Sequence, residues 1–119
     1  MKLAHPKYLV TAEEVAKGKP DPACYRLGAK RLGFSSLKES GSQHVDPDKI
    51  LVLEDAPAGV MAGKAAGYKV VALATTHSIE RLVEAGADWI VRDMRSVTMR
   101  EWDGKKGEVR IEIADALVR

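Results

Sequence analysis

The sequence has a single cysteine, Cys24, so it cannot form a disulfide within the chain. An isolated thiol is typical of proteins in reducing intracellular compartments. Its three histidines, His5, His44 and His77, are scattered and lack the spacing of a zinc site. The longest mostly apolar run, residues 70–74, is far shorter than the ~20 residues that span a bilayer, and the first residues lack the apolar segment of a secretory signal. We therefore expect a cytoplasmic protein that does not enter membranes.

No single sign of charge dominates either. Nineteen lysines and arginines face 17 aspartates and glutamates, which leaves a net charge of +2. This balance gives no reason to expect binding to nucleic acid or to anionic lipid. Hydrophobic residues make up 45% of the chain and charged residues 30%, as in globular proteins. At 119 residues the chain is expected to form one domain, since domains average ~150 residues.

Apolar runs that alternate with helix signals predict an α/β fold with an open, mostly parallel sheet and flanking helices. Continuous apolar runs predict strands buried on both faces, as in parallel sheets, at 50–53 and 69–74. Residues 37–48 are polar and predict a surface loop of variable length, and residues 94–100 fit no single pattern. Further strands are expected at 8–11, 89–91 and 108–113, and helices at 23–32, 57–66 and 78–85.

Two adjacent carboxylates, Glu54 and Asp55, follow the predicted strand 50–53 directly. Ligands of open α/β sheets bind beyond the carboxyl ends of the strands, and Mg²⁺ prefers oxygen ligands. The pair could equally cap the helix that follows, because acidic residues favour the positive end of the helix dipole. The residues alone leave both interpretations open.

Lys19 lies between Gly18 and Pro20, where a stiff backbone could aim its amine. An aimed lysine serves as a point charge for phosphate oxygens, but a surface lysine before a proline turn would look the same. Asp21 is expected to cap the helix that begins near residue 23. His77 either faces the same sheet edge as Asp55 or is an ordinary loop residue.

Three glycines, Gly59, Gly63 and Gly67, recur every fourth residue of the predicted helix 57–66. This spacing lets a helix approach a sheet closely. A nucleotide-binding loop is excluded, because Gly63-Lys64 is not followed by serine or threonine and no G-x-G-x-x-G occurs. Cys24 is expected to pack as a small apolar residue.

Taken together, the segment 18–22 (Gly-Lys-Pro-Asp-Pro) and, about thirty residues later, the segment 53–59 (Leu-Glu-Asp-Ala-Pro-Ala-Gly) resemble the third and fourth motifs of the haloacid dehalogenase superfamily of phosphatases. The longer stretch 54–67, followed by Ala-Thr-Thr at 74–76, is similar to the fungal glycerol-phosphate phosphatase and 2-deoxyglucose-6-phosphate phosphatase group. The resemblance extends over roughly residues 3–118 and implies a Rossmann-like core.

The resemblance also implies roles for particular residues. Lys19 would be catalytic and bind the substrate phosphate, and Asp55 with Glu54 would hold a catalytic Mg²⁺. Family members use an aspartate nucleophile that forms an aspartyl-phosphate, which water then hydrolyses. The substrate implied is a small phosphorylated sugar or polyol, such as glycerol phosphate or deoxyglucose 6-phosphate.

Three parts of the family pattern are not in this sequence. The nucleophile motif, Asp-x-Asp-Gly-Thr after an apolar strand, does not occur, and neither the second motif nor the cap domain is recognisable. We therefore expect the C-terminal portion of a phosphatase core, inactive alone. Without the nucleophile strand, strand 8–11 would lie ~10 Å from strand 50–53, and a missing N-terminal segment or a homo-oligomer would have to cover the exposed strand edges.

Two alternatives remain open at this stage. The chain could be a non-catalytic relative that binds Mg²⁺ or completes the sheet of a partner. A receiver-like domain shares the acidic strand end and the lysine, but it would also need a phospho-accepting aspartate, for which no convincing position exists. The identity of the phosphate ester cannot be read from a sequence without a cap domain.

Overall fold

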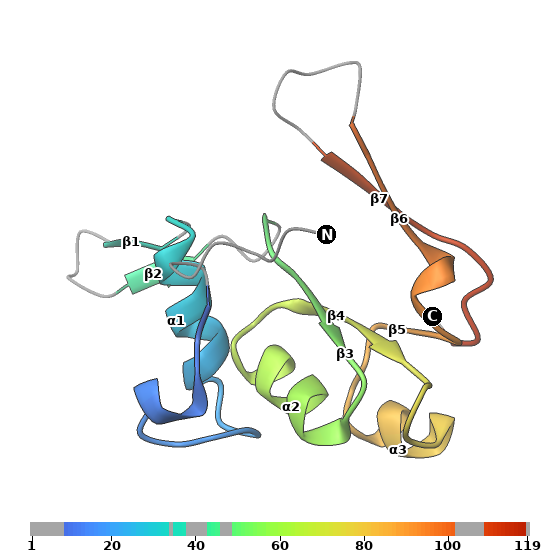
Figure 1. Cartoon of the computed structure of the whole chain (residues 1–119), viewed down its shortest axis with the longest axis horizontal. Helices are drawn as coiled ribbons and strands as arrows, with labels where there is room; N and C mark the ends of the chain where they lie inside the picture. The colour runs from blue at the N-terminus through green and yellow to red at the C-terminus, as the bar shows by residue number, and fades with distance from the viewer. Residues whose placement is uncertain (1–8, 34, 38–42, 46–48, 102–108, 119) are drawn as a thin grey trace.

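A three-stranded parallel sheet forms the centre of the protein (Figure 1). The computed structural model describes residues 9–33, 35–37, 43–45, 49–101 and 109–118. The sheet consists of β3 (Leu51–Glu54), β4 (Lys69–Leu73) and β5 (Trp89–Val91), in the order β3-β4-β5. Val71 of β4 pairs with Leu53 on one side and with Trp89 on the other. The predicted α/β class with a parallel sheet is confirmed.

Three helices accompany the sheet: α1 (Ala23–Arg31), α2 (Pro57–Ala65) and α3 (Ile79–Glu84). The ends of α2 and the start of α3 lie at the proline, serine and glycine residues from which they were predicted. Pro57 occupies the first turn of α2, and the Ser78 hydroxyl accepts a bond from the Arg81 amide at the start of α3. Gly67 follows α2 with a φ of 92°, a left-handed conformation that glycine adopts without strain. None of the described helices is long and apolar enough to cross a membrane.

The hydrophobic core lies between one face of the sheet and the helices. Close approach of α2 is possible because Gly63 has no side chain: a Cβ there would lie 2.8 Å from Val70 Cγ2 and 3.2 Å from Val52 Cγ1. The packing interpretation of this glycine is therefore confirmed. The buried residues of this cluster are Ala29, Val52, Val60, Tyr68, Val70, Ala72, Leu82 and Ile90.

The opposite face of the sheet is covered unevenly. Val71 and Val91 are fully buried, but Leu53 in β3 is 42% exposed. The prediction that strand 50–53 is buried on both faces is therefore wrong for this residue. β3 is also the edge strand of the described sheet, because its one partner there is β4.

Two antiparallel hairpins flank the parallel sheet. β1 (Ser35–Leu37) pairs with β2 (Gln43–Val45), so the segment 37–48, expected as a loop, contains a short strand in its described part. The unassigned segment 94–100 forms the 3-10 turn η4 (Met94–Ser96) and most of β6 (Val97–Glu101). β6 pairs with β7 (Val109–Ile113), which corresponds to the predicted strand at 108–113.

The predicted strand at 8–11 is the clearest error in the fold. Its described residues, 9–11, form no strand, and the 3-10 turn η2 (Ala12–Glu14) follows directly. The side chain of Glu14 explains this geometry: it accepts a bond from the Thr11 amide at 2.7 Å and pairs with Arg31 of α1 at 2.6 Å. These contacts fix the turn η2 against α1, and none of the described strands pairs with residues 9–11.

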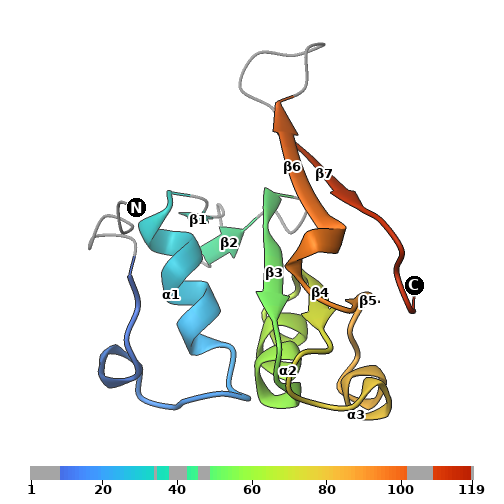
Figure 2. The same cartoon turned by 45° about the vertical axis from the view of Figure 1, so that its right-hand side comes forward.

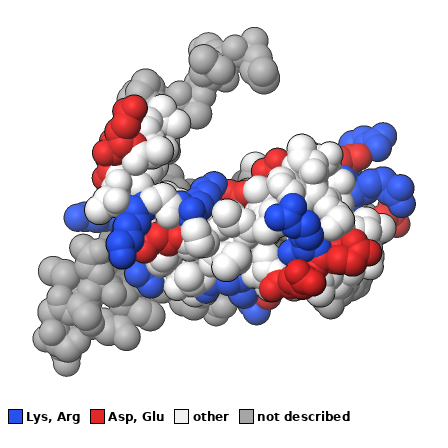
Figure 3. All heavy atoms as spheres, turned by 90° about the horizontal axis from the view of Figure 1, so that it is seen from below, with Lys and Arg blue, Asp and Glu red and all other residues white. Residues whose placement is uncertain are grey.

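Basic and acidic side chains are mixed over the face seen in Figure 3. This distribution agrees with the near balance of 19 cationic and 17 anionic residues. A continuous basic surface of the kind that nucleic acids bind is not present on this face.

A pair of neighbouring residues in α3 tests the placement of the core. Leu82 is fully buried, whereas Val83 beside it is 47% exposed. We expect Leu82→Ala to lower the free energy of unfolding by about 2–5 kcal/mol, because it leaves a cavity. Val83→Ala should change it by less than about 1 kcal/mol. Urea unfolding of both variants checks the contrast, and equal effects would contradict the described packing.

Candidate active site

The carboxyl end of β3 presents two carboxylates in different environments. Glu54, the last residue of the strand, is 8% exposed and lies on the side of α2, whereas Asp55 is exposed. Successive side chains of a strand point to opposite faces, which separates these neighbours. The two residues, expected to act as a pair, therefore have different partners.

The Glu54 carboxylate binds two side chains from distant parts of the sequence. The Lys19 ammonium forms an ion pair with Glu54 Oε1, and the Tyr25 hydroxyl of α1 donates to the same oxygen at 2.5 Å. The Lys19 ammonium also lies 5.2 Å from the centre of the Tyr25 ring, within the range of a cation–π contact. The structure thus brings Lys19 and Glu54 together, as the spacing of their segments suggested. Tyr25 was not anticipated as a member of this group.

The protonation states of the cluster are set by these contacts. Burial works against ionisation of Glu54, but the hydrogen bonds from Lys19 and Tyr25 outweigh it and hold the pKa of Glu54 below its ordinary value. Burial, together with the neighbouring Glu54 carboxylate, raises the pKa of the Tyr25 hydroxyl. Tyr25 therefore remains a protonated donor, and Glu54 remains an anion that holds the Lys19 cation in place.

Gly59 of α2 provides the space that the Glu54 carboxylate occupies. A Cβ at position 59 would lie 1.9 Å from Glu54 Cδ and about as close to both carboxylate oxygens. Gly59 thus has a different function from Gly63, which allows α2 to approach the strands. Of the three spaced glycines, Gly67 alone ends the helix.

Asp55 is held by the loop that follows β4. The Thr76 hydroxyl donates to Asp55 Oδ2 at 2.9 Å, and His77 Nδ1 lies 3.1 Å from the Asp55 carbonyl oxygen. Of the two interpretations of His77, the structure therefore supports the one in which it faces the same edge as Asp55. Thr76 was missed as a partner of Asp55, although its position after the next strand of a parallel sheet could have indicated it.

The remaining candidate residues have structural contacts. Asp21 Oδ1 accepts a bond from the Ala23 amide at 2.9 Å, which confirms its helix-capping role. Cys24 is a half-buried free thiol. Within the described ranges, no three histidine, cysteine, aspartate or glutamate residues converge into a ready metal-ligand set.

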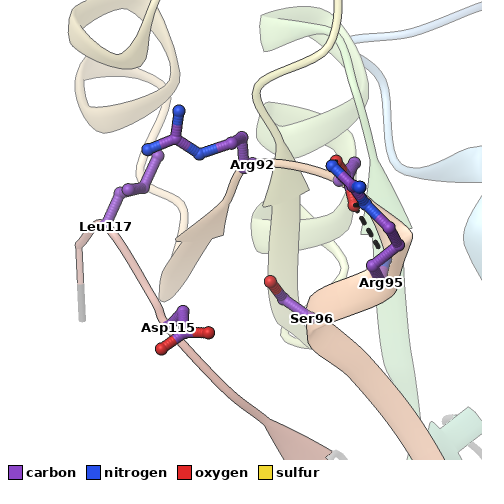
Figure 4. Close-up of a pocket in the computed structure, with 6 residues that line it drawn as sticks. Arg92, Arg95, Ser96, Asp115 and Leu117 are labelled. Atoms are coloured by element: carbon purple, nitrogen blue, oxygen red, sulfur yellow. Dashed lines mark hydrogen bonds and ion pairs between the residues drawn. The ribbon is translucent and has the colours of Figure 1, made fainter.

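A pocket of about 390 Å³ lies elsewhere, between the end of β5 and the C-terminal segment (Figure 4). None of the candidate site residues lines it. Two of its four charged residues are paired with each other, because Arg95 Nη2 contacts Asp93 Oδ2 at 2.7 Å. The lining residues are Arg92, Asp93, Arg95, Ser96, Asp115 and Leu117.

Two glycine substitutions test whether the carboxylate of Glu54 requires the space at position 59. We expect Gly59→Ala to lower the free energy of unfolding by about 1–3 kcal/mol, because the new methyl group must displace Glu54. Gly28 lies in α1, and a Cβ there would meet only Val10 Cγ2 at 3.9 Å. Gly28→Ala should therefore stabilise the protein by up to about 1 kcal/mol through helix propensity. Thermal unfolding would measure both, and stabilisation by Gly59→Ala would contradict the described contact.

The acid sensitivity of the fold tests the ion pair. Because the pKa of Glu54 is lower in the folded protein than its ordinary value of 4.5, its stabilising contribution is full above pH 4.5 and is lost as the pH falls further. Glu54→Gln should flatten this acid limb of the unfolding free energy, measured by urea titrations across pH. Tyr25→Phe keeps the carboxylate of Glu54 but removes one of its donors. The pH dependence of its unfolding free energy should therefore lie between those of the wild type and Glu54→Gln. An unchanged acid limb in Glu54→Gln would refute this assignment.

Comparison with known proteins identifies the family. The sequence matches the haloacid dehalogenase-like hydrolase family over residues 3–67, more than half of the chain. It is 40% identical to glycerol-1-phosphate phosphohydrolase 1 of Saccharomyces cerevisiae over 117 residues, which cover 98% of this chain and 45% of the relative. It is 38% identical to 2-deoxyglucose-6-phosphate phosphatase 2 of the same yeast over 94 residues, which cover 79% of this chain and 37% of the relative.

Solved structures agree as well. A hydrolase from Pseudomonas syringae matches with a TM-score of 0.58 and 29% identity, over 71% of this chain and 34% of that one. The chain thus spans less than half the length of the relatives it matches. The residues that bear the resemblance, Lys19 and Glu54-Asp55, meet at one strand end. The chain belongs to the haloacid dehalogenase-like hydrolase family.

Proposed function

We propose that this chain supplies the phosphate-binding and magnesium-binding part of a phosphomonoester hydrolase that acts on small sugar or polyol phosphates. One observation carries the proposal: Lys19 is held by Glu54 at the strand end that also presents Asp55. A fixed cation beside an exposed carboxylate suits the binding of a phosphate together with a divalent metal ion. Glycerol phosphate and 2-deoxyglucose 6-phosphate are the substrate types suggested by the yeast relatives.

Lys19 would bind the phosphate oxygens. Its side chain is 42% exposed, so the ammonium is reachable from solvent although it is paired with Glu54. Glu54 and Tyr25 restrict the lysine to one position, which lowers the entropic cost of holding it against a ligand.

Asp55 would be the principal magnesium ligand of this segment. Mg²⁺ binds one or two carboxylates and fills its remaining positions with water and substrate oxygens, which fits an exposed aspartate at a sheet edge. When bound, the metal would offset negative charge on the transferring phosphoryl group. Thr76 fixes one oxygen of Asp55, and no residue of the described ranges bonds the other. Glu54, also expected as a ligand, would contribute mainly by positioning Lys19, because its carboxylate is already engaged.

The nucleophile would come from outside these 119 residues, since they contain no Asp-x-Asp-Gly-Thr segment. Its carboxylate would attack phosphorus, the alcohol of the substrate would leave, and water would hydrolyse the aspartyl-phosphate to release inorganic phosphate and restore the carboxylate. Lys19 would stabilise the charge of the phosphoryl group during both steps. The chain alone would therefore bind ligands without turning them over.

A second candidate function is that of a non-catalytic relative that binds Mg²⁺ or completes the sheet of a partner. The observation in its favour is the edge strand β3, where Leu53 is 42% exposed. This candidate predicts the same metal binding, but it predicts no recovery of hydrolysis when a nucleophile-bearing segment is supplied.

Metal titration of the purified chain separates these functions from an ordinary helix cap at Glu54-Asp55. We expect Mg²⁺, or Mn²⁺ as a paramagnetic probe, to perturb the NMR signals around Asp55 and Thr76. Asp55→Asn should abolish the effect, and Asp115→Asn, which removes an exposed carboxylate elsewhere, should preserve it. Absence of any metal response at Asp55 would contradict the proposal.

Phosphate release is measured for the chain alone and for a protein in which a nucleophile-bearing segment is joined to it. The chain alone should release no phosphate from glycerol phosphate. In a protein that joins it to an Asp-x-Asp-Gly-Thr segment, Lys19→Met should lower kcat/KM by about 10²–10³, the loss typical of removing one group that stabilises transition-state charge. Turnover by the isolated chain that is sensitive to Asp55→Asn would refute the requirement for an external nucleophile.

A further inference from the structure

The hairpin of β6 and β7 presents an unpaired strand edge. It forms a separate two-stranded sheet that rises away from the parallel sheet (Figures 1 and 2). In the described part of the chain, β7 pairs with β6 and with no other strand. Two-stranded sheets are marginally stable alone, and a free edge is a template for another strand. The outer edge of β7 is therefore a candidate interaction surface.

The register identifies the backbone groups on this edge. The Ala114 amide donates to the Ser96 carbonyl oxygen at 2.9 Å, which makes this pair a hydrogen-bonded one. In an antiparallel ladder the bonded pairs recur at every second residue, so Glu112 and Arg110 direct their backbone groups toward β6. The amides and carbonyls of Ile111 and Ile113 consequently point to the free edge.

The side chains of β7 form a self-complementary pattern. Arg110 and Glu112 lie on either side of Ile111 and share one face of the hairpin. We propose that two copies of this chain associate by antiparallel pairing of β7 with β7, about a two-fold axis at Ile111. Arg110 then lies opposite the partner subunit's Glu112, and Glu112 lies opposite the partner subunit's Arg110. The result is a four-stranded antiparallel sheet in the order β6-β7-β7-β6.

The backbone and the charges select the same register. With Ile111 opposite its own copy, all outward amides and carbonyls face each other, and the Arg110–Glu112 pairs occupy non-hydrogen-bonded positions, where side chains are closest. A shift of two residues would place Arg110 opposite Arg110 or Glu112 opposite Glu112. A shift of one residue would place residues whose backbone groups point outward opposite residues whose backbone groups point toward β6. It would also bring the charged side chains of one copy onto the face that carries Ile111 in the other.

Among the described side chains of the hairpin, Arg100 and Arg110 share one carboxylate, that of Glu112. Arg100 lies directly opposite Arg110, a pairing of like charges that destabilises antiparallel strands. One carboxylate serves both: Glu112 lies 3.0 Å from Arg100 Nε and 3.8 Å from Arg110 Nε. The side chains of Arg110 and Glu112 are 59% and 44% exposed, so both can reach a partner. The dimer gives each Arg110 a second carboxylate.

The apolar face of the hairpin favours the same arrangement. Met99 is 73% exposed and Ile111, directly opposite it, is 38% exposed. The proposed pairing places the two Ile111 side chains together on this face and removes apolar surface from water. Self-pairing of β6 about Met99 would instead set Thr98 opposite Arg100, without complementary charges. A contact of one strand pair is smaller than a standard stable interface, so we expect weak, concentration-dependent dimers.

Sedimentation equilibrium over a wide range of concentrations tests this proposal, and circular dichroism verifies the fold of each variant. The wild-type chain should dimerise. Arg110→Glu and Glu112→Arg should each weaken dimerisation by about tenfold or more, because each creates two like-charge pairs. The double variant, with both substitutions, should dimerise again, and an equimolar mixture of the two single variants should form heterodimers. Arg100→Gln, on β6 and on the same face, is the matched control and should retain the dimer.

A chain that remains monomeric at all concentrations would overturn the proposal. A dimer that is insensitive to both single charge reversals would also overturn it. If that dimer dissociates on Leu53→Lys, the association uses the edge of β3 instead. None of these results bears on metal binding at Asp55, so the outcome is independent of the proposed function.

Discussion

The half-buried ion pair between Lys19 and Glu54 is the contact on which the arrangement of the site depends. It links the loop before α1 to the end of β3, across 35 positions of the sequence, and Tyr25 adds a contact from α1 itself. Removal of Lys19 would leave the largely buried Glu54 carboxylate with the Tyr25 hydroxyl but without a cation, which is a destabilising change. The same contact that joins the loop before α1 to the sheet therefore also holds the Lys19 cation at the end of β3. In the proposed function, the lysine that binds phosphate thus also stabilises the fold.

Most of the fold could be predicted because it depends on local signals. Continuous apolar runs marked β3 and β4, and Pro57 and Gly67 marked the beginning and end of α2. The strand at residues 8–11 was wrong because β propensity does not say whether a partner strand is available: Thr11 is extended, but none of the described strands pairs with this segment. The exposure of Leu53 could not be predicted either, because it depends on which elements cover the second face of the sheet.

The candidate site could be predicted in part. The position of Glu54-Asp55 at a strand end followed from the topology of a parallel sheet, and the resemblance to the family placed Lys19 near them, but neither indicated that the two carboxylates have different partners. This difference depends on the alternation of side chains along β3, on the approach of Tyr25 and on the missing side chain of Gly59. Tyr25 lies 29 positions from Glu54 in the sequence and Gly59 lies only a few positions from it. Neither contact follows from a periodic pattern in the sequence.

Gly59 has a consequence for the mechanics of the protein. The Glu54 carboxylate fills the space where a side chain at position 59 would stand. It therefore contacts both α2 and the Lys19 ammonium, and the packing of the helix and the position of the cation depend on the same carboxylate. A displacement of α2 toward the strands would press on the carboxylate, and a displacement outward would release it. We therefore expect substitutions that change how α2 packs on the sheet to shift the Glu54 carboxylate and, with it, the Lys19 ammonium.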